Sequence, residues 1–192
     1  MRTLFTAASA TALALLLVSG SPAEPATPAG QAANACLPGS GAFLRATLRG
    51  ALNADIDWRD TQISCEGSDR PDGRGLRITV AGPLPAVLGL GPRRLRFVFG
   101  IDTPGPGGTE QALPTNLTVI LEGEQQLFAT RGDDKCTTDR LRRSDPPPGA
   151  ASPTHVEARG FCTRPASTLD GSARLLISTF DFAASLSTEP TP

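Results

Sequence analysis

The sequence contains few of the residues from which metal and catalytic sites are usually built. Its 192 residues include no Tyr and only one Trp, one Met and one His. The four cysteines are nowhere spaced as CxxC, and with a single histidine this argues against a zinc site. No Gly-x-Ser-x-Gly elbow offers a nucleophile to accompany His155. We therefore predict no metal, no cofactor and no catalytic residue, and interpret His155 as an exposed strand residue.

An excess of charge of either sign is also absent. The formal net charge is −1, so the chain has no global field that would attract nucleic acid or an anionic membrane. Lys135 is the only lysine, and every other cationic side chain is an arginine. This dominance of Arg, together with abundant Ala, indicates a GC-rich bacterial genome. We expect no nucleic-acid partner.

Long apolar runs are missing except near the N-terminus. The run Ala7–Val18 follows Arg2 and is too short to span a membrane, as in the apolar region of a signal peptide. Ser21 and Ala23 supply small residues at the −3 and −1 positions of a cleavage site before Glu24. The sequence predicts a signal peptide over 1–23, a Pro/Ala-rich linker over 24–35 and a disordered tail over 188–192. With no transmembrane anchor, the mature protein is expected to be secreted or periplasmic.

Export explains the even number of cysteines, because disulfides persist in oxidising compartments. Four cysteines allow three pairings. We favour Cys36–Cys65 and Cys136–Cys162, since each pairing closes a moderate loop between neighbouring strands. Each loop of about 25–30 residues is expected to stabilise the fold by roughly 3–4 kcal/mol.

The remaining pattern is that of an all-β domain over residues 36–187. Gly and Pro are frequent, at 20 and 18 residues, and no convincing amphipathic helix is present. Apolar and polar residues alternate in several short runs that are separated by turn residues. We predict about eight to nine strands in a single antiparallel β-sandwich or barrel with two disulfides.

The densest apolar stretch, Leu95–Thr130, is expected to form the central antiparallel unit of this domain. Alternation before it predicts strands over Ala42–Arg49 and Leu52–Asp60, and the latter buries Trp58. Further strands are predicted over Leu76–Ala81, His155–Cys162 and Ala173–Leu186. The stretches Glu66–Gly75, Asp102–Gly108 and Arg131–Asp145 are interpreted as turns or loops.

Paired carboxylates are the first candidates for chemistry. Asp55 and Asp57 share one face of a predicted strand, about 7 Å apart. Such a pair can catalyse glycoside hydrolysis or bind Ca²⁺. Arg59 follows on the same face and would neutralise them, so a solvated outer face is the preferred interpretation.

Other acidic residues lie in predicted turns and loops. Asp69 and Asp72 lack the spacing of an EF-hand. A denser group surrounds Cys136 and includes Asp133, Asp134 and Asp139, but cationic residues lie between them, which favours charge compensation. Arg131-Gly132-Asp133 matches the tripeptide that integrin-binding proteins display, and a match of three residues is a weak signal.

Arginine on the outward positions of several strands gives a further possibility. If the strands were neighbours, these residues would form a basic stripe for an anionic polymer or a phospholipid headgroup. Ordinary pairing with Asp and Glu of adjacent strands is the preferred alternative. The residues are Arg45, Arg49, Arg77, Arg93, Arg94 and Arg96.

Together these observations favour an exported bacterial, non-enzymatic β-domain that binds an unknown protein or envelope ligand or has a structural role. Two alternatives stay open. One is a hydrolase that uses the carboxylates of Asp55 and Asp57. The other is a β-barrel carrier of an apolar ligand, with a cavity lined by side chains such as Phe97, Phe99 and Phe180. The oligomeric state does not follow from the sequence.

Overall fold

The computed structural model describes residues 36, 40–84, 93–103, 108–124, 126–147 and 153–186. The predicted signal peptide, linker and C-terminal tail lie outside these residues. The described part contains twelve strands and one short 3-10 turn, η1 (Asp60–Gln62). None of its helical segments is long and apolar enough to cross a membrane. The all-β, antiparallel fold is thereby confirmed.

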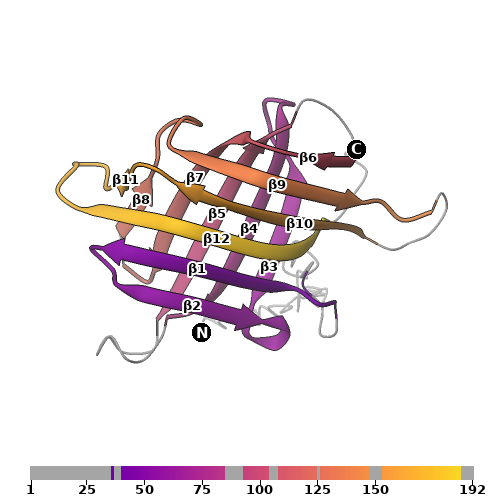
Figure 1. Cartoon of the computed structure of the whole chain (residues 1–192). Coiled ribbons are helices and arrows are strands. Elements are labelled where there is room, and N and C mark those ends of the chain that lie inside the picture. The colour runs from indigo at the N-terminus through magenta and orange to yellow at the C-terminus, as the bar shows by residue number, and fades with distance from the viewer. Residues whose placement is uncertain are drawn as a thin grey trace, which may run out of the picture. The chain divides into compact units, whose positions relative to one another are not determined.

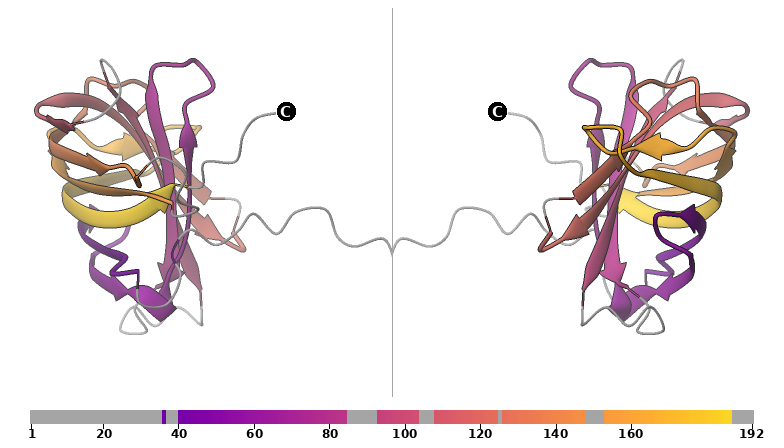
Figure 2. Two further views of the ribbon diagram at one scale, coloured as in Figure 1. Left: turned by 90° about the vertical axis from the view of Figure 1, so that its right-hand side faces the viewer. Right: turned by 90° about the vertical axis from the view of Figure 1, so that its left-hand side faces the viewer.

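Two layers of strands cross at a steep angle, as Figures 1 and 2 show. The first layer, called the bulged sheet here, has the order β2-β1-β12-β10-β9. Its strands are β1 (Phe43–Gly50), β2 (Ala54–Arg59), β9 (Cys136–Ser144), β10 (Thr154–Cys162) and β12 (Arg174–Leu186). The second layer, the regular sheet, has the order β3-β4-β5-β7-β8. Its strands are β3 (Ser64–Asp69), β4 (Gly75–Pro83), β5 (Arg94–Asp102), β7 (Leu113–Glu122) and β8 (Gln126–Ala129).

The two layers belong to one hydrogen-bonded network. The short strand β11 (Ala166–Ser167) pairs with both β8 and β12, and β7 pairs with β9 as well as with β8. A second short strand, β6 (Gly108–Glu110), pairs with β9. The pairings through β7, β8, β11, β12, β10 and β9 close on themselves, so the fold combines a closed ring of strands with open sheet extensions.

Aromatic rings fill the space between the layers. Phe97 and Phe99 on β5 are fully buried, and Phe99 lies 5.1 Å from Phe180 and 4.5 Å from Phe182 on β12, measured between ring centroids. Trp58 on β2 meets Phe97 edge-on at 5.7 Å, and its indole N–H donates to the carbonyl of Pro83. The alternation that predicts these strands therefore sends every second side chain into one shared core.

Leu95–Thr130 is central to the regular sheet, because β5 lies between β4 and β7, and β7 pairs with β8. Both predicted disulfides, Cys36–Cys65 and Cys136–Cys162, are present, and Cys136 is directly opposite Cys162 in the β9–β10 register. The interpretation of Arg131–Asp145 as a loop is wrong, since most of it forms β9. The turn predicted over Glu66–Gly75 is shorter, because β3 continues to Asp69.

Candidate functional site

The outer face of the bulged sheet carries a row of alternating charges. In the register of the sheet, Asp57 on β2 is opposite Arg45 on β1, and Arg45 is opposite Asp181 on β12. Asp181 is in turn opposite Arg159 on β10. The Arg45 guanidinium lies 3.5 Å from Asp57 and 3.6 Å from Asp181. The row therefore crosses the sheet at right angles to its strands.

Two interruptions of the register shape the surface beside this row. β12 has one extra residue at Ser178 relative to β1, and β9 has one extra residue at Asp139 relative to β10. Such bulges bend a strand and redirect its side chains. Asp139 is thereby placed on the outer face, where its carboxylate lies 3.7 Å from the Arg159 guanidinium.

Gly160 lies between the two bulges. A side chain at this position would overlap the Thr137 carbonyl oxygen and lie 2.5 Å from Cζ of Phe180. The absence of a side chain lets the Phe180 ring approach β10 closely, although the ring stays almost completely shielded from solvent. Gly160 and Phe180 are among the residues that line a depression in the outer face, while the Phe180 ring itself packs in the core.

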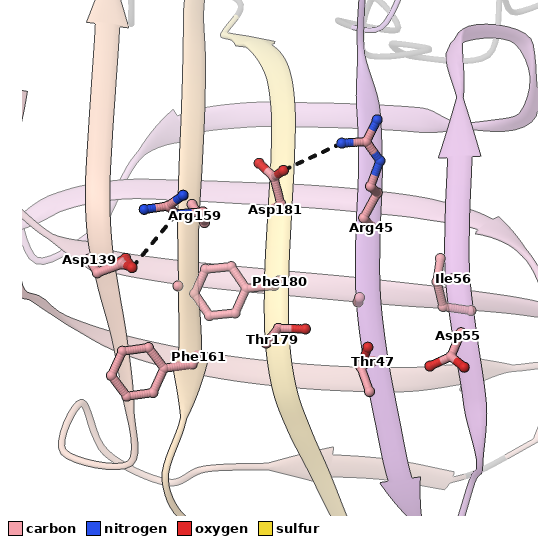
Figure 3. A pocket seen from close by; sticks show the side chains of 12 residues that line it. Arg45, Thr47, Asp55, Ile56, Asp139, Arg159, Phe161, Thr179, Phe180 and Asp181 are labelled. Atoms are coloured by element: carbon pink, nitrogen blue, oxygen red, sulfur yellow. Dashed lines mark ion pairs between the residues drawn. The ribbon is translucent and has the colours of Figure 1, made fainter.

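This depression has a volume of about 410 Å³ and is open to solvent. Figure 3 shows side chains from β9, β10, β12, β1 and β2 around it, with dashed lines for the Arg159–Asp139 and Arg45–Asp181 pairs. Thr47 and Thr179 lie opposite each other near its centre. Phe161 contributes an exposed phenyl ring on the β10 side, and Asp55 lies on the β2 side.

Asp55 and Asp57, the predicted carboxylate pair, lie in different parts of this surface. Asp55 lines the depression, whereas Asp57 belongs to the charged row and is not one of the lining residues. The hydrogen bond from Arg49 holds the pKa of Asp55 below its ordinary value, and an ion pair joins the same two side chains at 2.9 Å. A glycosidase needs one carboxyl group with a raised pKa as its general acid. Asp55 does not fit that role, and both carboxylates lie on an open face with side chains 71% and 57% exposed, which argues against the hydrolase alternative.

The packing of the aromatic side chains bears on the alternative of a β-barrel that carries an apolar ligand. Phe97, Phe99 and Phe180, the side chains expected to line a cavity, are buried and in contact with one another or with further rings. Ring centroids 4.5–6.1 Å apart are ordinary packing distances for aromatic side chains. These residues pack against one another in the core, which weighs against the carrier alternative.

The other acidic candidates do not converge. Asp133 pairs with Arg70, Asp134 with Arg164 and Asp139 with Arg159. Asp72 accepts hydrogen bonds from Arg70 and from the Arg74 backbone N–H, as expected of a turn residue. In the described ranges no three His, Cys, Asp or Glu side chains come together as a metal site would require.

The Arg131-Gly132-Asp133 tripeptide is held within the fold. Arg131 donates to the backbone carbonyls of Thr168 and Leu169, while Asp133 lies 3.8 Å from Arg70. Both side chains that an integrin-type partner would contact are therefore engaged. His155 is partly exposed on β10, 3.7 Å from Glu157.

The arginines of the predicted basic stripe lie on two different sheets and do not form one stripe. Arg45 and Arg49 lie on β1 in the bulged sheet, whereas the other four candidates belong to the regular sheet or its edge. Arg94 and Arg96 pair with Glu122, and Arg93 pairs with Glu124. For Arg93, Arg94 and Arg96 the observed pairs agree with the preferred alternative, pairing with nearby acidic residues.

Comparisons with known protein families, curated proteins and solved structures found no match.

Proposed function

We propose that this chain is an exported, non-enzymatic binding protein of the bacterial cell envelope, and that it binds its partner in the depression of the bulged sheet. Export is supported by the predicted signal peptide and by two disulfides, which persist in oxidising compartments. The observation that carries the binding role is the depression itself. It brings donors, acceptors and an exposed aromatic ring together on one rigid surface.

The surroundings of the site favour binding over catalysis. Its acidic side chains are each paired with an arginine, as in Arg49–Asp55, Arg45–Asp181 and Arg159–Asp139. A catalytic acid or base is usually set apart by burial or by a like charge that shifts its pKa towards the working pH. Here the carboxylates are at least one-third exposed and are compensated by cations.

Export is tested by expressing the full chain in a bacterial host and separating cytoplasm, periplasm and medium. We expect the protein outside the cytoplasm, with a mature N-terminus at Glu24 and no free thiol by intact mass. Retention in the cytoplasm with an uncleaved N-terminus contradicts the export part of the proposal.

Binding is tested by co-sedimentation of the purified mature domain with envelope fragments of the source bacterium. The double variant R45A/R159A removes both guanidinium groups that line the depression and is expected to abolish sedimentation. The matched control is R77A, an exposed arginine on β4 in the other sheet. Equal sedimentation of both variants would place the binding surface elsewhere.

A further inference from the structure

We infer that the ligand is an uncharged, hydroxyl-rich glycan chain that lies across the strands of the bulged sheet. The inference rests on the proposed binding role of the depression and adds the chemical class of the ligand.

The charges of the depression compensate one another. Asp181 lies 3.6 Å from Arg45, Asp139 lies 3.7 Å from Arg159, and Asp55 is paired with Arg49. Because each charge already has a partner of opposite sign, an anionic or cationic ligand would gain less here than at an unpaired charge. A hydroxyl group both donates and accepts, so it can bond to both members of a pair without separating them.

Two of these pairs, Arg45–Asp181 and Arg159–Asp139, leave hydrogen-bond donors and acceptors available for such a hydroxyl. Distances of 3.6 and 3.7 Å are longer than a direct hydrogen bond, and neither pair is joined by one. A group inserted between them can accept from the guanidinium and donate to the carboxylate. The hydroxyls of Thr47 and Thr179 add two neutral partners near the centre of the depression.

The aromatic ring suits the apolar face of a sugar. Phe161 is 38% exposed, which makes it one of only two large apolar side chains that are exposed within the described residues. It lines the depression, so its ring can cover the C–H face of a pyranose while the polar groups contact the hydroxyls. A volume of about 410 Å³ is within the range of small-ligand sites.

The polar groups repeat across the sheet at a spacing that a glycan can follow. Neighbouring strands lie about 4.8 Å apart, close to the length of one pyranose residue in an extended chain. The charged row runs in this direction, from Asp57 on β2 to Arg159 on β10. A second depression of about 180 Å³ shares Arg159 and Asp181 and extends the surface towards Arg140 and Arg142 on β9. Several sugar residues can therefore be contacted in sequence.

The experiment measures binding of the disulfide-intact mature domain to neutral oligosaccharides by titration calorimetry. The probes are hexasaccharides of β-1,4-glucan, β-1,3-glucan, mannan and chitin. We expect at least one to bind, with affinity about ten-fold lower in F161A, because the loss of an aromatic contact is commonly worth this much. The matched control is L169A, which removes the other exposed large apolar side chain, 72% exposed and outside the depression. L169A is expected to bind like the parent protein.

Salt separates an uncharged ligand from an anionic one. Binding of a neutral glycan should change less than about two-fold between 0.05 and 0.5 M NaCl, whereas a polyanion would lose affinity steeply. Binding only to acidic polysaccharides, with a steep salt dependence, would overturn the inference. So would a neutral glycan that binds F161A and L169A equally well.

The proposed function can survive the failure of this inference. If no oligosaccharide binds, but the domain still sediments with envelope fragments through Arg45 and Arg159, the binding role stands and the ligand is not a neutral glycan. Loss of that sedimentation after protease treatment of the fragments would identify a protein partner. If neither glycans nor fragments bind, both proposals fail.

Discussion

The two sheets differ in whether the register between their strands is interrupted by bulges. In the regular sheet, β4 pairs with β5 from Gly75 to Pro83, and β5 pairs with β7, without a shift. The bulged sheet contains two shifts, at Ser178 in β12 and at Asp139 in β9. The depression extends from β9 to β2, and its lining includes Asp139 and Thr179, the residue after Ser178. The irregular sheet is therefore the one in which outward side chains are gathered into a site.

The ion pairs on the outer faces of the two sheets also differ. Arg96 on the regular sheet donates a direct hydrogen bond of 2.7 Å to Glu122. On the bulged sheet, Arg45 and Arg159 hold their carboxylate partners at 3.6 and 3.7 Å, with no direct hydrogen bond. Arg49 on the bulged sheet does donate directly to Asp55, so the contrast is confined to Arg45 and Arg159, which keep donors available for a ligand.

The largest expected effect comes from the core that both sheets share. F99A removes a fully buried ring that contacts Phe180 and Phe182 across the interface between the layers. We expect a loss of about 3–5 kcal/mol in the free energy of unfolding, measured by urea denaturation. F161A, on the outer face, is the control and should cost less than about 1 kcal/mol. Similar losses for the two variants would contradict the assignment of Phe99 to the core and Phe161 to the surface.

The disulfides allow the next comparison, because each sheet has one. Cys36–Cys65 spans a sequence separation of 29 and ends on β3, and Cys136–Cys162 spans a separation of 26 and joins β9 to β10. Loops of such similar length should contribute about 3–4 kcal/mol each on the chain-entropy account. The double variants C36S/C65S and C136S/C162S are therefore expected to lose similar stability in urea. A difference above about 2 kcal/mol would show that one sheet depends more on its disulfide than loop length explains.

The strands of the regular sheet were predictable because their side chains alternate strictly. In β5, Leu95, Phe97 and Phe99 are buried and the residues between them are not, which is the period of two that a strand requires. The pairing of the cysteines was predictable because each pair closes a loop of moderate length. Both predictions use information that is local in the sequence.

β9 was missed because its bulge breaks this period. Its buried residues are Cys136, Thr138 and Leu141, so the interval changes from two to three at Asp139, and only Leu141 is large and apolar. The depression could not be predicted for a related reason. It depends on Arg45, Arg159 and Asp181 becoming neighbours, and their register is set by pairing between strands distant in the sequence.

Two glycines test whether the bulged sheet depends on its irregularity. In G160A the added methyl group would overlap the Thr137 carbonyl oxygen and crowd Phe180, so we expect a loss of about 1–3 kcal/mol in urea unfolding. The matched control is G100A on β5, where the nearest atom to the added methyl would be 3.6 Å away, an ordinary contact. G100A should be neutral or slightly stabilising, since alanine has less conformational freedom to lose in the unfolded chain. If both variants are neutral, Gly160 does not define the approach of Phe180 to β10.

The smallest expected effect concerns the segment that joins the two sheets, between β11 and β12. Asp170 accepts hydrogen bonds from the hydroxyl of Thr168 and from the backbone N–H and hydroxyl of Ser172, and these lower its pKa from 3.8 to about 2. Because the folded pKa lies below the ordinary one, the ionised carboxylate stabilises the fold above about pH 4. This stabilisation is lost as the pH falls through 2.

The variant D170N should therefore have a lower Tm than the parent protein at pH 5–7. The difference should shrink between pH 4 and 2, as the parent carboxylate becomes protonated. Thermal unfolding followed by circular dichroism at half-unit pH steps measures both curves. A difference in Tm that is constant over this range would mean that the hydrogen bonds to Asp170 do not depend on its charge.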